Sequence, residues 1–487
     1  MNKIHIVSGT TSARIHLDPN RTLWDFISKI AFEHLIVRQW NKRLHKFEID
    51  RAYGLFDTNR GIFHIPINFL PVFEEAIRST NFPYEHIVQA PVEPGKITIQ
   101  LKKDWIARED QVPAIEYLSN EATPRRGLAA QPGFGKTSIA TAAAVKMGYP
   151  TLVIASGLYQ QWAQSIYNQT TAVKKDIWIL AGAKSIHDAW IADVTPSFLI
   201  ASLETLREYV YRSTPYRDIP PYREFLKKFK IGTKIMDEVH LHFYAGTRID
   251  LASNIANNIY LTATFGQSDR AHRKVFNTIF PYSMRFGEED YDAYVTSTQY
   301  LYNGWVPEGV TRSNRGYNHN RFENYLLKRK TYLKRYFDEV VDTVFSTEYI
   351  HYKTKGDKCM IYFARIEMIE YAVAYLQQHY PELKISPFYK TQELSAVSHN
   401  DVLVTNLKKG GVGKDLKDLC AVICTVAFRT DIGLKQLIGR LRRRADGKPV
   451  RYSDITDNCN TAQYSMYEAR RYELKSLASS NNEVTLF

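Results

Sequence analysis

The residues best suited to chemistry lie in the stretch Gln131-Pro132-Gly133-Phe134-Gly135-Lys136-Thr137-Ser138, which directly follows Ala130. Glycine permits the backbone conformations that let successive N–H groups turn inward around phosphate oxygens. A helix that begins at the lysine aims its positive end at those oxygens, the lysine adds a charge, and the threonine hydroxyl can ligate Mg²⁺. The stretch therefore predicts a phosphate-binding loop for ATP and Mg²⁺, with Ala130 where the usual pattern has its first glycine.

A second reactive group follows 101 residues after Lys136, in Ile235-Met236-Asp237-Glu238-Val239-His240. In phosphate-loop NTPases an aspartate at a strand end holds Mg²⁺, and an adjacent glutamate can polarise the attacking water. We predict these roles for Asp237 and Glu238. The strand before them is interrupted by Thr233-Lys234, so a solvated turn stays open as an alternative.

A third group lies near the carboxyl end, in Gln436-Leu437-Ile438-Gly439-Arg440-Leu441-Arg442-Arg443. Phosphoryl transfer spreads negative charge over the γ-oxygens, and arginines from a second domain can neutralise it. Arg440 and Arg443 are the candidates, with Gln436 as a further catalytic residue. Because six basic residues lie between Arg440 and Arg451, a basic helical face or a nucleic-acid contact remains the alternative.

The elements that must position these residues can be read from apolar runs. From about 96 to 280, TLVIAS, DIWILAG, SFLIAS and NIYLTAT alternate with helix-length segments, and from about 285 to 470 the alternation resumes around CMIYFA, DVLVTN and CAVICTV. Such alternation is typical of parallel sheets with helical crossovers. The helix after the phosphate loop should end at Gly148, a natural cap.

A small α+β module precedes these two α/β units. Residues 53–56 and 62–65 read as strands around a turn at 57–61, a helix pattern runs from Phe69 to Ile77, and a Pro- and Gly-containing linker occupies 90–95. We therefore predict an accessory domain at 1–94, a first α/β domain at 95–283 and a second at 284–487.

Composition and charge limit the class of protein. The 487 residues are 44% hydrophobic and carry a formal net charge of +13, as in a globular protein with basic character. Residues 1–95 hold 11 basic and 10 acidic side chains, so the excess charge, and with it the expected nucleic-acid surface, belongs to the later part. Four cysteines without a Cys-x-x-Cys pair indicate a reducing compartment. We find no signal peptide or membrane-spanning run and expect a cytoplasmic protein, in the host cell if the chain is viral.

Taken in order, these stretches resemble the motifs of superfamily 2 helicases, which bind ATP between two RecA-like domains. The resemblance implies an adenine-reading element at Arg108–Gln111, backbone-contacting motifs at 152–162 and 199–205, and a coupling motif at 261–265. It also implies motif four at 360–364 and motif five at 401–415. The implied nucleotide-binding residues are Arg108, Gln111, Gln131, Pro132, Gly133, Phe134, Gly135, Lys136, Thr137, Ser138, Gly413 and Asp415, with Thr137 and Asp237 on the metal. Ser156 and Thr405 would contact DNA.

The first domain, from Arg51 through Arg60 and Pro66, is similar to the N-terminal module of UvsW-type phage branch-migration helicases. This resemblance implies that the domain at 1–94 recognises the DNA substrate. It also implies a monomeric ATP-dependent DNA helicase that moves 3′ to 5′ and remodels forked and four-way-junction DNA in phage replication, recombination or repair. The chain departs from the pattern at Ala130 and in Lys408-Lys409-Gly410-Gly411.

Two alternatives follow from what the motifs leave open. The motor motifs do not state which polymer they grip, so a double-strand DNA translocase or an RNA helicase without junction specificity is an alternative, with RNA the less favoured partner. A nucleic-acid-binding module that does not hydrolyse ATP is disfavoured because Lys136, Asp237, Glu238 and both arginines occur together.

Two further features have open interpretations. Asn303-Gly304 between Tyr300-Leu301-Tyr302 and Trp305-Val306 predicts a two-residue hairpin. Tyr302 and Trp305 could stack on bases there as a strand-separating pin, or the hairpin could be an ordinary edge hairpin. The basic run from Arg321 to Arg335 fits either a solvated helix face or a phosphate-binding strip.

Overall fold

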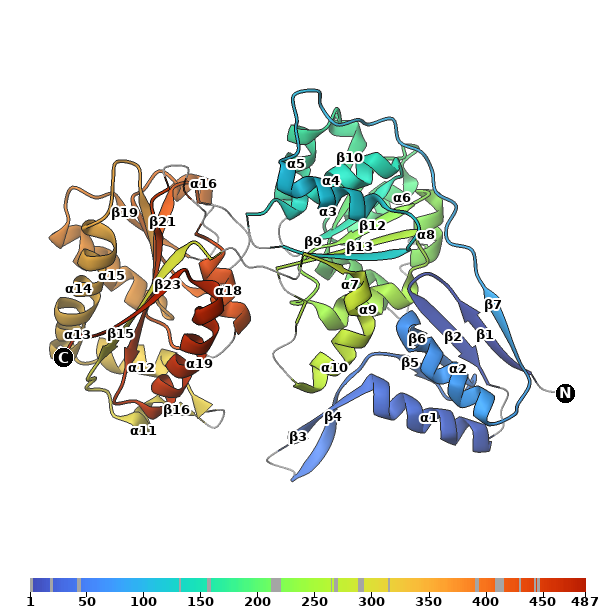
Figure 1. Ribbon diagram of the computed structural model, residues 1–487, viewed down its shortest axis with the longest axis horizontal. Coiled ribbons are helices and arrows are strands. Elements are labelled where there is room, and N and C mark those ends of the chain that lie inside the picture. The colour runs from blue at the N-terminus through green and yellow to red at the C-terminus, as the bar shows by residue number, and fades with distance from the viewer. Residues whose placement is uncertain are drawn as a thin grey trace. The chain divides into compact units, whose positions relative to one another are not determined.

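The computed structural model describes residues 3–17, 21–41, 45–130, 133–155, 159–211, 220–263, 265–266, 270–287, 293–313, 316–389, 394–407, 416–428, 431–441, 444 and 447–487. These residues form two compact units, Met1–Glu289 and Asp290–Phe487. Figure 1 shows the elements of each. No described helix is both long and apolar enough to span a bilayer.

The N-terminal module is built on a five-stranded sheet of order β5-β6-β2-β1-β7. The predicted strand–turn–strand is confirmed, because β5 and β6 pair antiparallel and are followed by a helix. The module comprises β1 (Ile4–Ser8), β2 (Ser12–His16), α1 (Arg21–Leu35), β3 (Ile36–Asn41), β4 (Lys46–Ala52), β5 (Leu55–Asp57), β6 (Ile62–Pro66), α2 (Leu70–Ser79) and β7 (Tyr84–Val88). The strands β3 and β4 form a separate two-stranded sheet.

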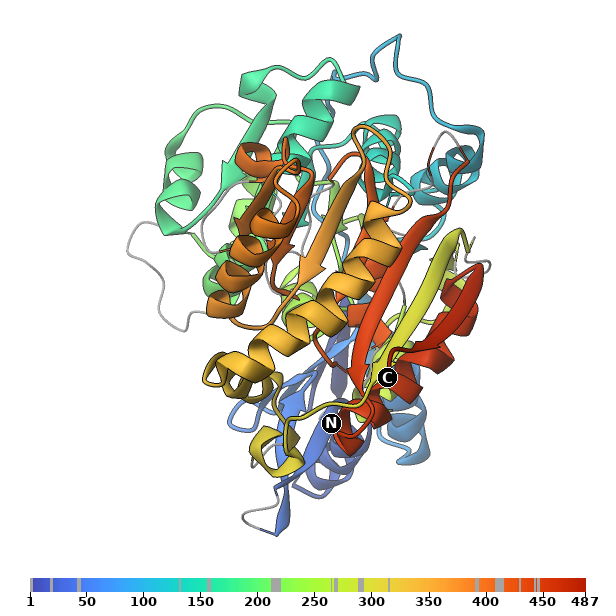
Figure 2. The ribbon, with the colours of Figure 1, turned by 90° about the vertical axis from the view of Figure 1, so that its left-hand side faces the viewer.

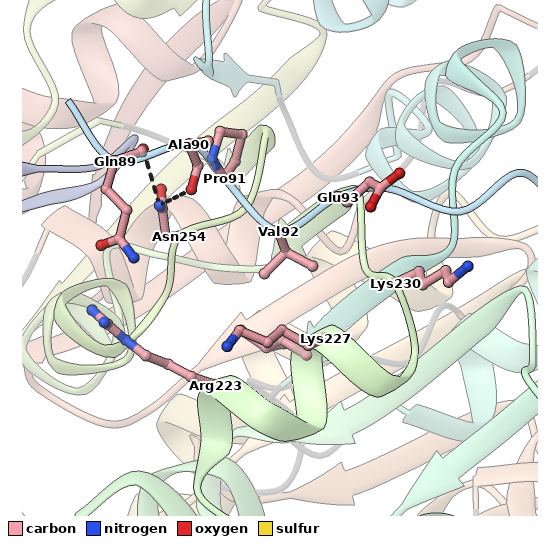
Figure 3. A pocket seen from close by; sticks show the side chains of 10 residues that line it. Gln89, Ala90, Pro91, Val92, Glu93, Arg223, Lys227, Lys230 and Asn254 are labelled. Atoms are coloured by element: carbon pink, nitrogen blue, oxygen red, sulfur yellow. Dashed lines mark hydrogen bonds between the residues drawn. The ribbon is translucent and has the colours of Figure 1, made fainter.

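Polar contacts fasten this module to the α/β domain that follows it within the first unit. The Thr10 hydroxyl donates to the Ile255 carbonyl at 2.7 Å, and the Thr11 hydroxyl donates to the Asp250 carbonyl at 2.8 Å. The Asn254 amide donates to the carbonyls of Gln89 and Ala90 in the linker (Figure 3). The linker is thereby held on the surface of the α/β domain.

A pocket of about 350 Å³ lies beside this linker. The side chains of Arg223, Lys227 and Lys230 border it together with Glu93 (Figure 3). Its lining includes none of the residues predicted for the ATP site.

The first α/β domain has a seven-stranded parallel sheet of order β10-β11-β9-β12-β13-β8-β14. All four predicted apolar runs are strands of it. Its elements are α3 (Val112–Ser119), β8 (Arg125–Ala129), α4 (Lys136–Met147), β9 (Thr151–Ala155), α5 (Tyr159–Gln169), β10 (Ile177–Leu180), α6 (Ala183–Ile191), β11 (Phe198–Ser202), α7 (Leu203–Tyr211), α8 (Tyr222–Lys228), β12 (Thr233–Met236), α9 (Phe243–Ala252), β13 (Asn257–Thr262), α10 (Arg270–Ile279) and β14 (Arg285–Phe286). Because β14 belongs to this sheet, the domain extends beyond the expected boundary at 283.

The polar interruption before Asp237 does not break the strand. Lys234 is fully buried in β12, where its ammonium forms an ion pair with Asp250. The Tyr260 hydroxyl donates to the second oxygen of that carboxylate at 2.8 Å. A buried charge is tolerated when it is paired and hydrogen-bonded, so β12 forms as predicted and the solvated-turn alternative does not apply.

The second unit holds another seven-stranded parallel sheet, of order β19-β20-β18-β21-β22-β15-β23. The three predicted runs are β18, β20 and β21. Its elements are β15 (Val295–Tyr302), α11 (Glu308–Thr311), β16 (Arg312–Ser313), β17 (Gly316–Tyr317), α12 (His319–Leu327), α13 (Lys330–Tyr336), α14 (Asp342–Phe345), β18 (Lys358–Tyr362), α15 (Ile366–His379), β19 (Ile385–Phe388), α16 (Leu394–Val397), β20 (Val402–Thr405), β21 (Leu419–Cys424), α18 (Asp431–Ile438), β22 (Val450–Asp457), α19 (Thr461–Leu477) and β23 (Ser480–Thr485). Two tandem RecA-like domains after a small α+β module are therefore the fold, as expected.

The predicted hairpin at 300–306 is wrong. The strand β15 ends at Tyr302 and lies between β22 and β23, parallel to both, as Figure 2 shows for the yellow strand. Gly304 is not part of a turn, and its lack of a side chain lets its backbone lie close to Asp457. Its N–H donates to the Asp457 carboxylate at 3.0 Å, and a Cβ on Gly304 would lie 1.9 Å from Asp457 Oδ2.

The aromatic residues expected in the pin are occupied in packing. Tyr302 is buried, and the Trp305 ring stacks on Phe487 with centroids 5.8 Å apart. The Arg335 guanidinium lies 4.2 Å from the centroid of Trp305. A ring in these contacts has little surface left for a base, so the structure gives the pin hypothesis no support.

The basic run at 321–335 lies on α12 and α13. Arg335 pairs with Glu339 at 2.9 Å, and Lys334 pairs with Asp338 one helical turn ahead. The Arg329 guanidinium lies 3.8 Å from the centroid of Tyr325. These contacts favour the solvated helix face over the phosphate-binding strip.

Candidate nucleotide site

The phosphate loop joins β8 to α4 at the carboxyl edge of the first seven-stranded sheet, where ligands of such sheets bind. Gly133 and Gly135 adopt φ values of 89° and 95°, which glycine tolerates and other residues do not. The helix begins at Lys136 and ends at Gly148, whose N–H donates to the Ala144 carbonyl at 3.0 Å. The first amides of α4 therefore open toward the loop.

The predicted adenine-reading element holds the loop from outside. Gln111 is buried, and its amide donates to the Phe134 carbonyl at 2.7 Å. The Arg108 guanidinium donates to the same carbonyl at 2.9 Å. A Cβ on Gly135 would lie 2.5 Å from the Gln111 amide nitrogen. The structure thus brings Arg108 and Gln111 together with the loop.

Lys136 and the acidic pair at the end of β12 meet across the loop. The Lys136 ammonium donates to the Ala130 carbonyl at 3.0 Å and lies 3.7 Å from Glu238 Oε1. Burial, reinforced by the neighbouring charge of Glu238, raises the pKa of the Asp237 carboxyl, and Lys136 opposes that rise. The residues expected for phosphate, metal and water are therefore assembled at one edge of the sheet.

Trp162 contacts the candidate site in a way that the sequence analysis did not predict. It closes the motif at 152–162 that was expected to contact a nucleic-acid backbone. In the structure its indole N–H donates to Asp237 Oδ2 at 3.0 Å, while the Glu238 N–H donates to Oδ1 at 3.0 Å. Both bonds hold the Asp237 side chain in place and favour its charged form. No local sequence signal predicts this contact, because 75 residues separate its partners.

Glu238 has a backbone conformation that residues other than glycine rarely adopt. Its φ is 48°, in the left-handed region, which costs about 1–2 kcal/mol. One oxygen of its carboxylate is buried and accepts no hydrogen bond from the described residues. Such strain clusters at functional sites. The conformation turns an acceptor toward the site.

His240 connects the acidic pair to the predicted coupling motif. Its Nδ1 lies 3.4 Å from Glu238 Oε2 and 2.6 Å from the Thr262 hydroxyl, which ends β13. The Val239 N–H donates to the Leu261 carbonyl at 3.1 Å. A short chain of contacts therefore joins Glu238 to Leu261 and Thr262.

The donor set suits a phosphate and a hard divalent cation. Two adjacent carboxylates, Asp237 and Glu238, face one ammonium group, so a further cation would offset their repulsion. Thr137 and Asp237 could hold Mg²⁺, which commonly keeps several waters and takes one or two protein ligands beside a phosphate. Among the described residues, no group of three or more His, Cys, Asp or Glu side chains could hold a metal ion. Mg²⁺ at this site would therefore depend on a phosphate and waters as further ligands.

The remaining predicted residues are less fully placed. Arg440 follows α18 in the second unit and is largely buried. Thr405 ends β20, is fully buried, and donates from its hydroxyl to the Phe388 carbonyl at 2.6 Å, so its predicted DNA contact stays a prediction. The backbone of Gln436 lies in α18, but its side chain is not described. Outside the described residues lie Gln131, Pro132, Ser156, Lys408, Lys409, Gly410, Gly411, Gly413, Asp415 and Arg443.

Known proteins resemble this chain in sequence and in fold. No protein-family model matches the chain. Over 472 residues it is 22% identical to a protein of Escherichia phage T5 named "Probable helicase D10", a similarity that covers 90% of this chain and 87% of that protein.

Two solved structures are also similar. The DNA-bound ATP-dependent Type ISP restriction-modification enzyme LlaBIII matches 85% of this chain and 34% of its own, at 14% identity and a TM-score of 0.51, which supports the fold. The crystal structure of T4 UvsW matches 100% of both chains at 14% identity, but its TM-score of 0.37 is too low to carry an argument. The expected resemblance to a phage helicase is confirmed.

Proposed function

We propose that this chain, which resembles superfamily 2 helicases of phages, is an ATP-dependent DNA helicase that unwinds or branch-migrates forked and four-way-junction DNA. The observation that carries the proposal is the assembly of Lys136, Asp237 and Glu238 around the phosphate loop, with His240 connecting it to Thr262. A binding module without hydrolysis would have no need for this arrangement.

In the proposed reaction, Lys136 leaves the Ala130 carbonyl and binds the β- and γ-phosphates of ATP. Thr137 and Asp237 would hold Mg²⁺, which would neutralise charge on the phosphates. The Glu238 carboxylate takes a proton from a water that attacks the γ-phosphorus, and the bond from that phosphorus to the β–γ bridging oxygen breaks as ADP leaves. Arg440 and Arg443 stabilise the charge that develops on the transferred phosphoryl group.

Hydrolysis would be coupled to DNA movement through His240. When Glu238 changes partners during the reaction, its contact with His240 changes, and the hydrogen bond between His240 and Thr262 passes that change to the coupling motif. A packed chain of two-state contacts is the physical requirement for such coupling. We infer 3′ to 5′ translocation from the resemblance.

Two observations support DNA as the partner. The LlaBIII structure, whose fold this chain shares, was solved with DNA. Nearly all of the excess positive charge lies after residue 95, as expected for a motor that grips a phosphate backbone. The resemblance of the N-terminal module to phage branch-migration helicases supports junctions as the substrate.

ATP hydrolysis with and without DNA tests the proposal. The unmodified chain should hydrolyse ATP faster when DNA is present, and Lys136→Ala should abolish hydrolysis. Lys146→Ala is the matched control, because Lys146 lies on the same helix but its exposed ammonium pairs with Glu116.

The outcome also separates the alternatives. If Lys136→Ala still hydrolyses ATP, the phosphate loop is not the site of hydrolysis. Stimulation by RNA but not by DNA would indicate an RNA helicase, and stimulation by duplex DNA without strand separation would indicate a translocase.

A further inference from the structure

The ribbon formed by β3 and β4 has an apolar face that no other strand covers. Figure 1 shows the two strands projecting from the N-terminal module. In their antiparallel register Trp40 lies opposite Phe47, and Arg38 lies opposite Ile49. Directly opposed residues share a face of a sheet, so these four side chains form one surface, which we call the aromatic face.

The aromatic face is open to solvent. The exposed fractions are 46% for Trp40, 60% for Phe47 and 59% for Ile49. The opposite face is polar, with Gln39 across from Glu48. The hydrophobic side of this ribbon is therefore turned outward, whereas a hydrophobic face is normally buried against a core. Exposed apolar surface of this kind marks an interaction site.

A cationic group, the Arg38 guanidinium, lies against the rings. The Arg38 guanidinium lies 4.6 Å from the centroid of Phe32 at the end of α1 and 5.8 Å from that of Phe47. The rings of Trp40 and Phe47 meet edge to face at 5.0 Å, which leaves ring surface accessible. Residues 36–52 contain five of the 11 basic residues in 1–95 and only two of the 10 acidic ones.

The base of the ribbon is fixed to the motor domain. His272 of α10 donates from Nε2 to the Asp50 carboxylate at 2.9 Å. Its Nδ1 shares a hydrogen bond with the Tyr53 hydroxyl at 2.7 Å. The Arg51 guanidinium lies 5.2 Å from the centroid of Tyr244 in α9. A rigid base lets the ribbon hold a ligand at a defined place relative to the first RecA-like domain.

We propose that the aromatic face binds unpaired DNA bases by stacking. Rings beside the Arg38 guanidinium match a polyanion whose bases present flat π-surfaces, and the excess of basic over acidic residues in 36–52 favours nucleic acid over an acidic or neutral protein surface. The face would hold a displaced or single-stranded segment near a branch point. This inference rests on the proposed helicase function and adds a DNA site in the N-terminal module, outside the motor motifs.

Equilibrium binding without nucleotide tests the inference. The probes are a fluorescent fork with unpaired arms and a blunt duplex of the same length, and the variants are Trp40→Ala and Phe47→Ala. Loss of one base stack should weaken fork binding about 5- to 150-fold and leave duplex binding nearly unchanged. Trp40→Phe should retain most of the affinity, and Gln39→Ala, on the opposite face, is the matched control.

Salt and hydrolysis measurements keep the outcomes distinct. The loss in Trp40→Ala should persist as salt is raised, because stacking is not electrostatic, whereas Arg38→Gln should reduce the salt dependence. Fork affinity unchanged in both alanine variants, with DNA-stimulated hydrolysis intact, would overturn the inference and point to a protein partner for this face. Absence of DNA-stimulated hydrolysis in the unmodified chain would instead refute the proposed function.

Discussion

Replacing Trp162 by phenylalanine should shift the pH dependence of ATP hydrolysis. The indole N–H donates to Asp237 at 3.0 Å and lowers the pKa of a carboxyl that burial and Glu238 raise. A hydrogen bond to a charged group is worth about 1.5–3 kcal/mol, and about 1.4 kcal/mol corresponds to one pH unit. Without the bond, Asp237 should take up its proton about one to two pH units higher.

The proposed metal ligand is the deprotonated carboxylate, so activity exists above the pKa of Asp237 and is lost as the pH falls through it. The acid limb of kcat/KM for ATP reports the free enzyme and should therefore move to higher pH in Trp162→Phe. Trp178→Phe, a half-buried tryptophan of β10, controls for the loss of an indole. If Trp162→Phe keeps the acid limb of the unmodified chain, the bond does not set the ionisation of Asp237.

Three further substitutions test other parts of the structure. Lys234→Met should lower the free energy of unfolding, measured in urea, by about 3–5 kcal/mol, because it leaves the buried Asp250 carboxylate without its ion pair. Lys227→Met is the control, and it should change that free energy by less than about 1 kcal/mol because it breaks an exposed pair. Thr262→Val should lower DNA unwinding about tenfold, through loss of one hydrogen bond of about 1.4 kcal/mol to His240, while ATPase without DNA stays near that of the unmodified chain; equal losses in both rates would argue against coupling through this contact. Gly135→Ala should raise the KM for ATP about 5- to 30-fold, since a left-handed conformation costs other residues about 1–2 kcal/mol, and an unchanged KM would show that the loop adapts.

The parts of the fold that the sequence predicted are those set by local pattern. The apolar runs became strands because parallel strands are buried on both faces, and the loop around Gly133 and Gly135 formed because its conformation depends on nearby residues. The order of motifs along the chain also pointed to the residues of the first domain that the structure brings together around the phosphate loop. These features need no knowledge of distant contacts.

Features that depend on distant contacts were missed or misread. Lys234 is a poor strand residue until Asp250, on the following helix, pairs with it. The signal at Asn303-Gly304 suggested a turn, but the glycine is needed for its approach to Asp457, more than 150 residues away. The contact of Trp162 with Asp237 also depends on residues far apart in the sequence, because the sheet brings the ends of β9 and β12 together.

The N-terminal module shows a different limit. Its nearly balanced charge, 11 basic against 10 acidic residues in 1–95, did not indicate a nucleic-acid surface, and the expected role in recognising the DNA substrate came only from the resemblance to phage branch-migration helicases. The structure gathers basic and aromatic residues on one ribbon, and only the strand register puts Trp40 beside Phe47. Average charge over a domain conceals such a local concentration.

A gel assay of a labelled four-way DNA junction tests the central claim most directly. The unmodified chain with ATP and Mg²⁺ should convert the junction to two-armed products, and neither the same chain without ATP nor the Lys136→Ala variant should do so. A junction that stays intact with the unmodified chain, under conditions where DNA stimulates its ATPase, would contradict the claim that this protein is a junction-directed DNA helicase.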